Sequence, residues 1–266
     1  MLAGGVAAGA FGSLLGLGGG ILIVPLLTIG FGLPLREAVG VSLICVIVTS
    51  GASAGVYLER HVANLRLGMT LELFTAIGAL VGGLGAFLVS EGILAALFAI
   101  LLVYVAVTMV RSRGPERELD PDTAAAAPVR HPLGLPLDGP DYAVRNVGRG
   151  VAGSLGAGVV SALLGIGGGL IKVPVMHLVM GVPLRVATAT SNLMIGVTAS
   201  ASAIIYLLRG GIDPLVVGPT AIGVFLGASL GSRTAHRIDL RILRLLFVLV
   251  LSYTAFEMIR RAVGAT

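Results

Sequence analysis

The chain has 266 residues, of which 56% are hydrophobic and only 12% are charged, and its formal net charge is +5. Since a soluble domain has about a quarter of its residues charged, this composition excludes an ordinary water-soluble protein. The basic residues are all arginine except Lys172, and most lie in short loops between apolar segments. This placement is typical of topology signals and lipid contacts, so we expect a lipid bilayer and no nucleic acid as partner.

The first part of the chain contains four apolar segments that we expect in the membrane. The first is unusually long and is interrupted by a glycine triplet, Gly18, Gly19 and Gly20. A break at the triplet predicts two half-helices, arranged either as a kinked span or as a re-entrant hairpin. Backbone interrupted at membrane depth is tolerated only where protein or a wet cavity surrounds it, so the break should face inward. The segments cover about residues 3–31, 38–58, 67–90 and 92–111.

The segment 112–147 differs in composition from everything around it. It holds half of the prolines, several acids and a run of four alanines, with no apolar periodicity. These features predict a solvent-exposed linker, which we place in the cytoplasm. The chain is thereby divided into a first membrane unit, residues 1–111, and a second, residues 148–266.

The second unit is an offset copy of the first. Adding 149 to a residue number places LGLGGG, which begins at Leu15, on LGIGGG, which begins at Leu164, and keeps Val-Pro and Pro-Leu-Arg in register. Four further apolar segments follow from this register, at about 150–182, 186–208, 214–234 and 240–260. The sequence therefore predicts an all-α polytopic membrane protein with two homologous repeats of four segments each.

The number of crossings depends on the broken segments. If every segment spans the bilayer, the protein has eight crossings and the repeats are parallel. If the broken segments are re-entrant, each repeat has three crossings and the repeats are inverted. The uneven distribution of arginines between corresponding loops slightly favours inverted repeats.

The glycine triplets Gly18–Gly20 and Gly167–Gly169 are the first candidate site. They are not a dinucleotide fingerprint, because no strand precedes them and no Walker lysine follows. We expect the second half-helices to start at Gly20 and Gly169. Their free amides and positive dipole ends could receive an anion. The alternative is that these glycines only permit close helix packing.

Polar side chains near the triplets complete the candidate set. Lys172, the only lysine, lies three residues after the second triplet. An intramembrane lysine normally faces a cavity or a partner, although snorkelling to the headgroups is an alternative. Ser42, Ser191 and Asn192 could donate to an oxyanion, whereas Thr198 is assigned to helix–helix hydrogen bonding. Glu72 is predicted to snorkel to the interface.

These residues resemble the sulfite exporter TauE/SafE family of membrane permeases. The shared pattern occurs as GLGGGILIVPLL with GLPLREAVGVS, and again as GIGGGLIKVPVM with GVPLRVATATS. The second copy departs in having Ala189 where the first has Gly40, and Lys172 is not part of the family pattern. The resemblance implies a transporter of sulfur-containing anions such as sulfite, thiosulfate or organosulfonates.

The expected function is therefore a secondary transporter in a bacterial plasma membrane, with a small anion as substrate and no cofactor. The lone Cys45 excludes a disulfide framework or a cysteine metal site, and no motif of an enzyme is present. A non-transporting or channel-like subunit, in which the glycines serve packing only, remains the alternative. Whether the chain forms a homo-oligomer is left open.

Overall fold

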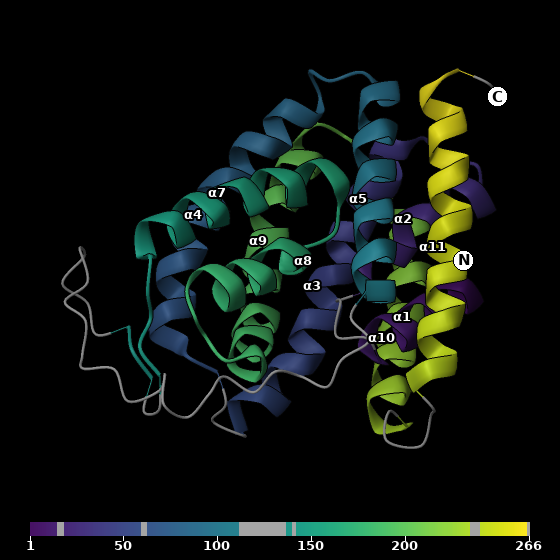
Figure 1. Ribbon diagram of the computed structural model, residues 1–266. Coiled ribbons are helices and arrows are strands. Elements are labelled where there is room, and N and C mark those ends of the chain that lie inside the picture. Colours follow the sequence, from purple (N-terminus) through teal and green to yellow (C-terminus); the bar gives the residue numbers. More distant parts are fainter. Residues whose placement is uncertain (15–18, 60–62, 112–136, 140–141, 235–239, 265–266) are drawn as a thin grey trace.

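Every named secondary-structure element in the computed structural model is a helix (Figure 1). The structure describes residues 1–14, 19–59, 63–111, 137–139, 142–234 and 240–264. The elements of the first part are α1 (Leu2–Leu14), α2 (Gly20–Pro25), the π-helical turn η1 (Leu26–Gly30), α3 (Leu35–Glu59), α4 (Leu65–Ala86) and α5 (Glu91–Arg111). Those of the second part are α7 (Val147–Leu164), α8 (Gly169–Pro174), η2 (Val175–Val179), α9 (Leu184–Leu208), α10 (Pro214–Thr234) and α11 (Leu240–Ala262).

The two broken segments form helical hairpins. In the second, the chain folds back so that Gly150, early in α7, lies against Met180, which follows η2, and the amide of Arg145 donates to the Met180 carbonyl at 2.9 Å. In the first, Gly4 of α1 lies against Leu26 of η1. The start and the end of each segment are therefore neighbours. A kinked continuous span, one of the two arrangements that the sequence allowed, is wrong.

The helices α3 and α9 cross the interior next to each other in antiparallel directions. Gly40, near the start of α3, lies against Gly211, just after α9. Near the other end of α3, the Ser50 hydroxyl donates to the Asn192 carbonyl of α9 at 2.8 Å. Both helices carry buried small and β-branched side chains, which let the two backbones approach closely.

Each hairpin packs its first helix on the other half of the chain. α1 lies parallel to α10, with Gly223 and Gly227 of α10 against Leu2 and Val6 of α1. α7 packs on α4 in the same way, on the left of Figure 1. Glycine is required at these contacts because a Cβ would overlap the facing backbone. The packing interlocks the two halves of the chain.

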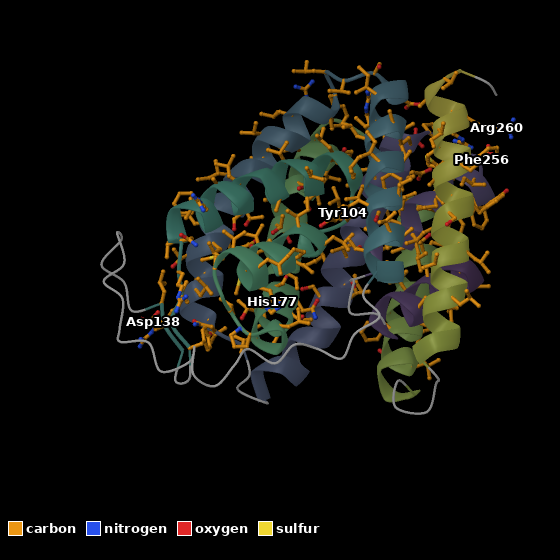
Figure 2. All side chains as sticks on the ribbon, viewed as in Figure 1. Tyr104, Asp138, His177, Phe256 and Arg260 are labelled. Carbon is orange, nitrogen blue, oxygen red and sulfur yellow. The ribbon has the colours of Figure 1, made fainter. Side chains whose placement is uncertain are left out.

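An apolar outer surface surrounds this interior. Leu88 of the α4–α5 turn is 88% exposed and Leu215 of α10 is 84% exposed. Contact of so many large apolar side chains with water would be unfavourable, so this surface fits a lipid environment. Phe256 and Arg260 point outward from α11 (Figure 2). Within the described residues, four helices are long and apolar enough to cross a membrane: Leu65–Ala86, Glu91–Thr108, Val147–Leu164 and Val186–Leu208. Shorter apolar helices, such as Gly20–Gly30 and Gly169–Val179, accompany them.

The end of the predicted linker is packed against the helices. Leu137 and Val144 are fully buried, and the Asp138 carboxylate accepts a hydrogen bond from the Val144 amide at 2.7 Å. The Asn64 side chain donates to the Leu137 carbonyl at 2.8 Å and to the Tyr142 hydroxyl at 2.9 Å. The prediction of a solvent-exposed segment is therefore wrong for these residues, because two apolar anchors bury it. Residues 112–136 lie outside the described residues.

Asn64 is also the N-cap of α4, since its side-chain oxygen accepts a hydrogen bond from the Leu67 amide at 3.0 Å. We expect Asn64→Ala to lower the free energy of unfolding by about 1–2 kcal/mol through loss of the cap, in addition to the loss of the two bonds that the side chain donates. Thermal unfolding of the purified protein in detergent measures this change. Asn64→Asp is the matched control, because it keeps the cap and loses only the two donated bonds. Equal losses in both variants would mean that the cap contributes nothing.

Candidate functional site

The two glycine breaks meet in the interior of the protein. Gly20, the first residue of α2, lies so close to Gly165 that a Cβ on it would stand 2.7 Å from the Gly165 carbonyl oxygen. The Ser42 hydroxyl joins the two breaks, at 2.7 Å from the Gly165 carbonyl and 3.3 Å from the Gly20 carbonyl. Segments more than a hundred residues apart in sequence therefore form one structural centre.

The backbone at both breaks requires glycine. Gly19 has a φ of 75° and precedes α2, and Gly168 has a φ of 77° and precedes α8. This left-handed conformation is strained for residues with a side chain. The predicted half-helix starts at Gly20 and Gly169 are confirmed. As at any helix start, the first amides lack partners within the helix and carry its partial positive charge.

Two buried hydroxyls lie beside the second break. Ser191 of α9 is 1% exposed, and its Oγ would stand 3.4 Å from a Cβ on Gly169. Ser161 of α7 is fully buried, and its Cβ would stand 3.4 Å from a Cβ on Gly168. Neither hydroxyl has a hydrogen-bond partner among the described residues. A buried hydroxyl without a partner is unfavourable, so both are free to serve a ligand.

The charged part of the site is an ion pair between the two halves of the chain. Lys172 Nζ of α8 lies 2.6 Å from Glu72 Oε2 of α4. The Thr198 hydroxyl of α9 accepts from Lys172 Nζ at 2.9 Å and donates to Glu72 Oε1 at 2.6 Å. The two charged side chains are only 2% and 6% exposed, so the cluster is screened from solvent.

This arrangement corrects two sequence-based interpretations. Glu72 does not snorkel to the interface, because the paired Lys172 holds it in the interior. Thr198 bridges both charges and so belongs to the site, although the sequence assigned it to helix packing. Glu72 is the only acid in α4, and Lys172 is the only lysine in the chain. Two lone opposite charges in membrane segments are expected to pair, and that signal could have identified Glu72.

The remaining predicted residues lie around this centre, except for one that the structure does not describe. Gly167 packs against Val46 and Ile195, which makes it part of the contact between the halves. Asn192 is buried, and its carbonyl oxygen accepts the bond from Ser50. Gly18 lies outside the described residues. Among those described, no group of three or more histidine, cysteine or acidic residues could hold a metal ion.

A polytopic helical bundle with an apolar surface and a polar, charged cluster at interrupted helices defines a class, that of multi-pass membrane transporters. The sequence profile of the family Sulfite exporter TauE/SafE matches residues 1–258. The chain therefore belongs to the TauE/SafE family. It is a multi-pass integral membrane protein and a transporter rather than an enzyme, and its partners include the membrane and a small substrate.

Two relatives carry transporter names. The chain is 24% identical over 257 residues to "Probable membrane transporter protein YunE" of Bacillus subtilis (strain 168), which covers 92% of this chain and 93% of the relative. It is 29% identical over 205 residues to "Probable membrane transporter protein MJ0441" of Methanocaldococcus jannaschii, which covers 75% of this chain and 68% of the relative. No solved structure matches the chain significantly. Neither relative's name states a substrate.

Proposed function

We propose that this protein is a secondary transporter for small sulfur-containing anions, such as sulfite, thiosulfate or organosulfonates, in a bacterial plasma membrane. The observation that carries the proposal is the pair of unpartnered buried hydroxyls, Ser161 and Ser191, beside the second glycine break. Hydroxyl donors, helix-start amides and the Lys172 ammonium are the groups that stabilise an oxyanion in a water-poor site. The sulfur chemistry of the substrate is taken from the family resemblance.

We further propose that the two units are inverted repeats. The elements of the two units correspond at an offset of 149 residues. The helices α2, η1 and α3 begin at residues 20, 26 and 35, and their counterparts α8, η2 and α9 begin at residues 169, 175 and 184. The antiparallel contact of α3 with α9, which correspond at this offset, supports inversion. The end of α11 likewise approaches the start of α5, where Ala262 lies near Gly92. Such repeats allow alternating access by rocking around a site at the midplane.

The alternative function is a non-transporting or channel-like membrane subunit in which the glycines serve packing only. The close contacts of Gly223 with Leu2 and of Gly20 with Gly165 favour a packing role for many of the glycines. Packing does not account for Ser161 and Ser191, because their hydroxyls contribute no hydrogen bond to the described protein. A ligand-binding measurement therefore separates the two functions.

The test is thermal stability of the detergent-purified protein with sulfite, thiosulfate, sulfoacetate, taurine, sulfate, chloride, bicarbonate and a neutral solute. A ligand at 100 times its dissociation constant should add about 2.7 kcal/mol to the free energy of unfolding. Stabilisation by a sulfur anion, and not by chloride or the neutral solute, is the expected result. A folded, monodisperse protein that responds to none of these anions would favour the packing function.

Substitution of one unpartnered serine tests the anion site directly. We expect Ser191→Ala to leave the stability of the anion-free protein unchanged within about 1 kcal/mol, since the hydroxyl has no protein partner to lose. The same variant should lose most of the stabilisation by the anion. Ser154→Ala is the control, because Ser154 is also buried and unpartnered but lies two turns from Ser161 along α7. An anion response that survives in Ser191→Ala would exclude this hydroxyl from the site.

A further inference from the structure

The buried Lys172–Glu72 pair contains an acid, and the binding of an anion alone does not explain why an acid lies beside the lysine. Its two charges cancel, so in the observed state Lys172 offers no net attraction to a substrate. An anion that joined the intact pair would add an uncompensated negative charge to a site of low polarity. An anion that displaced Glu72 from Lys172 would instead leave the carboxylate buried without its partner. Either outcome is strongly unfavourable.

Uptake of one proton by Glu72 removes this conflict. The protonated carboxyl is neutral and can still donate to or accept from the Thr198 hydroxyl, which lies 2.6 Å from Glu72 Oε1. Lys172 then keeps its positive charge and can turn toward the anion. For an anion with a single charge the charges balance: the ion pair, one proton from solvent and one anion become a neutral Glu72 and an ammonium–anion pair. On release of the anion, the proton leaves and the original pair re-forms.

The Lys172 side chain runs beside the second glycine break. Its Cε would stand 3.5 Å from a Cβ on Gly168, so the side chain passes directly beside the turn that the two unpartnered serines adjoin. An ammonium has three hydrogens, and the described residues accept two of them, at Glu72 and Thr198. Since the four-carbon stem of lysine is flexible, we infer that the ammonium turns from the carboxylate toward these hydroxyls when an anion binds there.

Other described charged and titratable groups on the neighbouring elements lie too far toward the surface to take this role. Arg66 of α4, Arg149 of α7 and Arg209 at the end of α9 are exposed. His177 of η2 is half-buried, and its Nδ1 lies 2.9 Å from the Val182 carbonyl oxygen. Tyr206 of α9 donates to the Ala162 carbonyl at 3.0 Å. Lys172 is therefore the charged group that faces Glu72 among the described side chains.

The corresponding positions of the first half are apolar. At the offset of 149, Lys172 corresponds to Ile23, and Glu72 corresponds to Ala221. Ile23 is fully buried and Ala221 packs against the core. Among the described residues the pair therefore has no counterpart at these positions of the other half, so a coupling through it would involve one proton for each anion.

We propose that Glu72 is the proton-coupling residue of the transporter. Its carboxylate takes up one proton when the Lys172 ammonium leaves it and binds the substrate anion. The proposal rests on the proposed function, because it requires an anion at Lys172. It defines the protein as a carrier that moves one proton together with each anion. Anion binding should then strengthen as the pH falls and weaken as the pH rises.

Isothermal titration calorimetry with methanesulfonate and ethanesulfonate tests the coupling, since both probes carry a single, constant negative charge near neutral pH. In the pH range where Glu72 is ionised in the free protein, we expect the dissociation constant to rise about tenfold per pH unit. Titrations in two buffers of different ionisation enthalpy should show one proton taken from the buffer per bound anion. Glu72→Gln, which imitates the protonated carboxyl, should bind the anion with no pH dependence and no proton uptake.

Two further variants keep the outcomes separate. Glu91→Gln removes an exposed acid at the start of α5 and should retain the pH dependence of the unmodified protein. Glu72→Asp keeps a carboxyl group and should also retain it. If Glu72→Gln does not fold, Glu72→Asp and the proton count of the unmodified protein decide the matter.

Anion binding that is independent of pH in the unmodified protein would overturn the coupling and leave the proposed transport function intact. The coupling would also be overturned if Glu72→Gln kept the full pH dependence. If the folded, unmodified protein bound neither probe nor any sulfur anion of the panel, the transport function and the coupling would both be overturned. In proteoliposomes, Glu72→Gln should retain exchange of anion for anion and lose uptake driven by a pH gradient.

Discussion

Replacing Lys172 by methionine is expected to lower the free energy of unfolding by about 3–5 kcal/mol. The substitution preserves most of the volume of the side chain but removes the ammonium that lies 2.6 Å from Glu72 Oε2. Glu72 is then left as a buried charge with only the Thr198 hydroxyl as a partner. Thermal or denaturant unfolding of the purified protein in detergent, compared at neutral pH, measures the loss.

The double variant Lys172→Met with Glu72→Gln is the decisive control for this prediction. Since it removes both charges together, it should recover much of the stability that the single variant loses. The cycle of the two single variants and the double variant therefore isolates the coupling between the two side chains. A single Lys172→Met variant as stable as the unmodified protein would show that the pair is not formed in the folded state.

The second large effect is expected at the contact of the two breaks. Gly20→Ala places a Cβ 2.7 Å from the Gly165 carbonyl oxygen and 2.8 Å from Val46 Cγ2. The carbonyl is backbone and cannot rotate away, so the two breaks must separate. We expect a loss of about 1–3 kcal/mol in the free energy of unfolding, as for other overpacked interiors.

The same substitution should abolish anion-dependent stabilisation, because it lengthens the hydrogen bond by which Ser42 joins Gly165 to the first half. Gly85→Ala in α4 is the matched control, since nothing lies within 4 Å of a Cβ at that position. This control should be neutral or slightly stabilising, because alanine favours the helix over glycine. A Gly20→Ala protein with unchanged stability and anion response would mean that the close approach of the breaks is not required.

The sequence alone determined the class of the protein and the position of its breaks. A composition with few charges requires a bilayer as solvent, and backbone polar groups in a bilayer must be satisfied within helices. The helix starts at Gly20 and Gly169 follow from local chemistry, since only glycine adopts the turn that precedes them without strain. The register of the two units is also readable from the sequence, because glycine, proline and arginine recur at one offset.

Only the tertiary structure decided how the breaks are folded and which polar groups meet. A glycine turn is compatible with a kink or with a hairpin, and the contact of Gly150 with Met180 selects the hairpin. Glu72, Lys172 and Thr198 come from three helices, and their distances depend on how α4, α8 and α9 pack. Helix periodicity fixes which face of one helix is polar, but it contains no information about the neighbour across that face. The ion pair, and with it the proposed route for the proton, therefore arises from packing between distant segments.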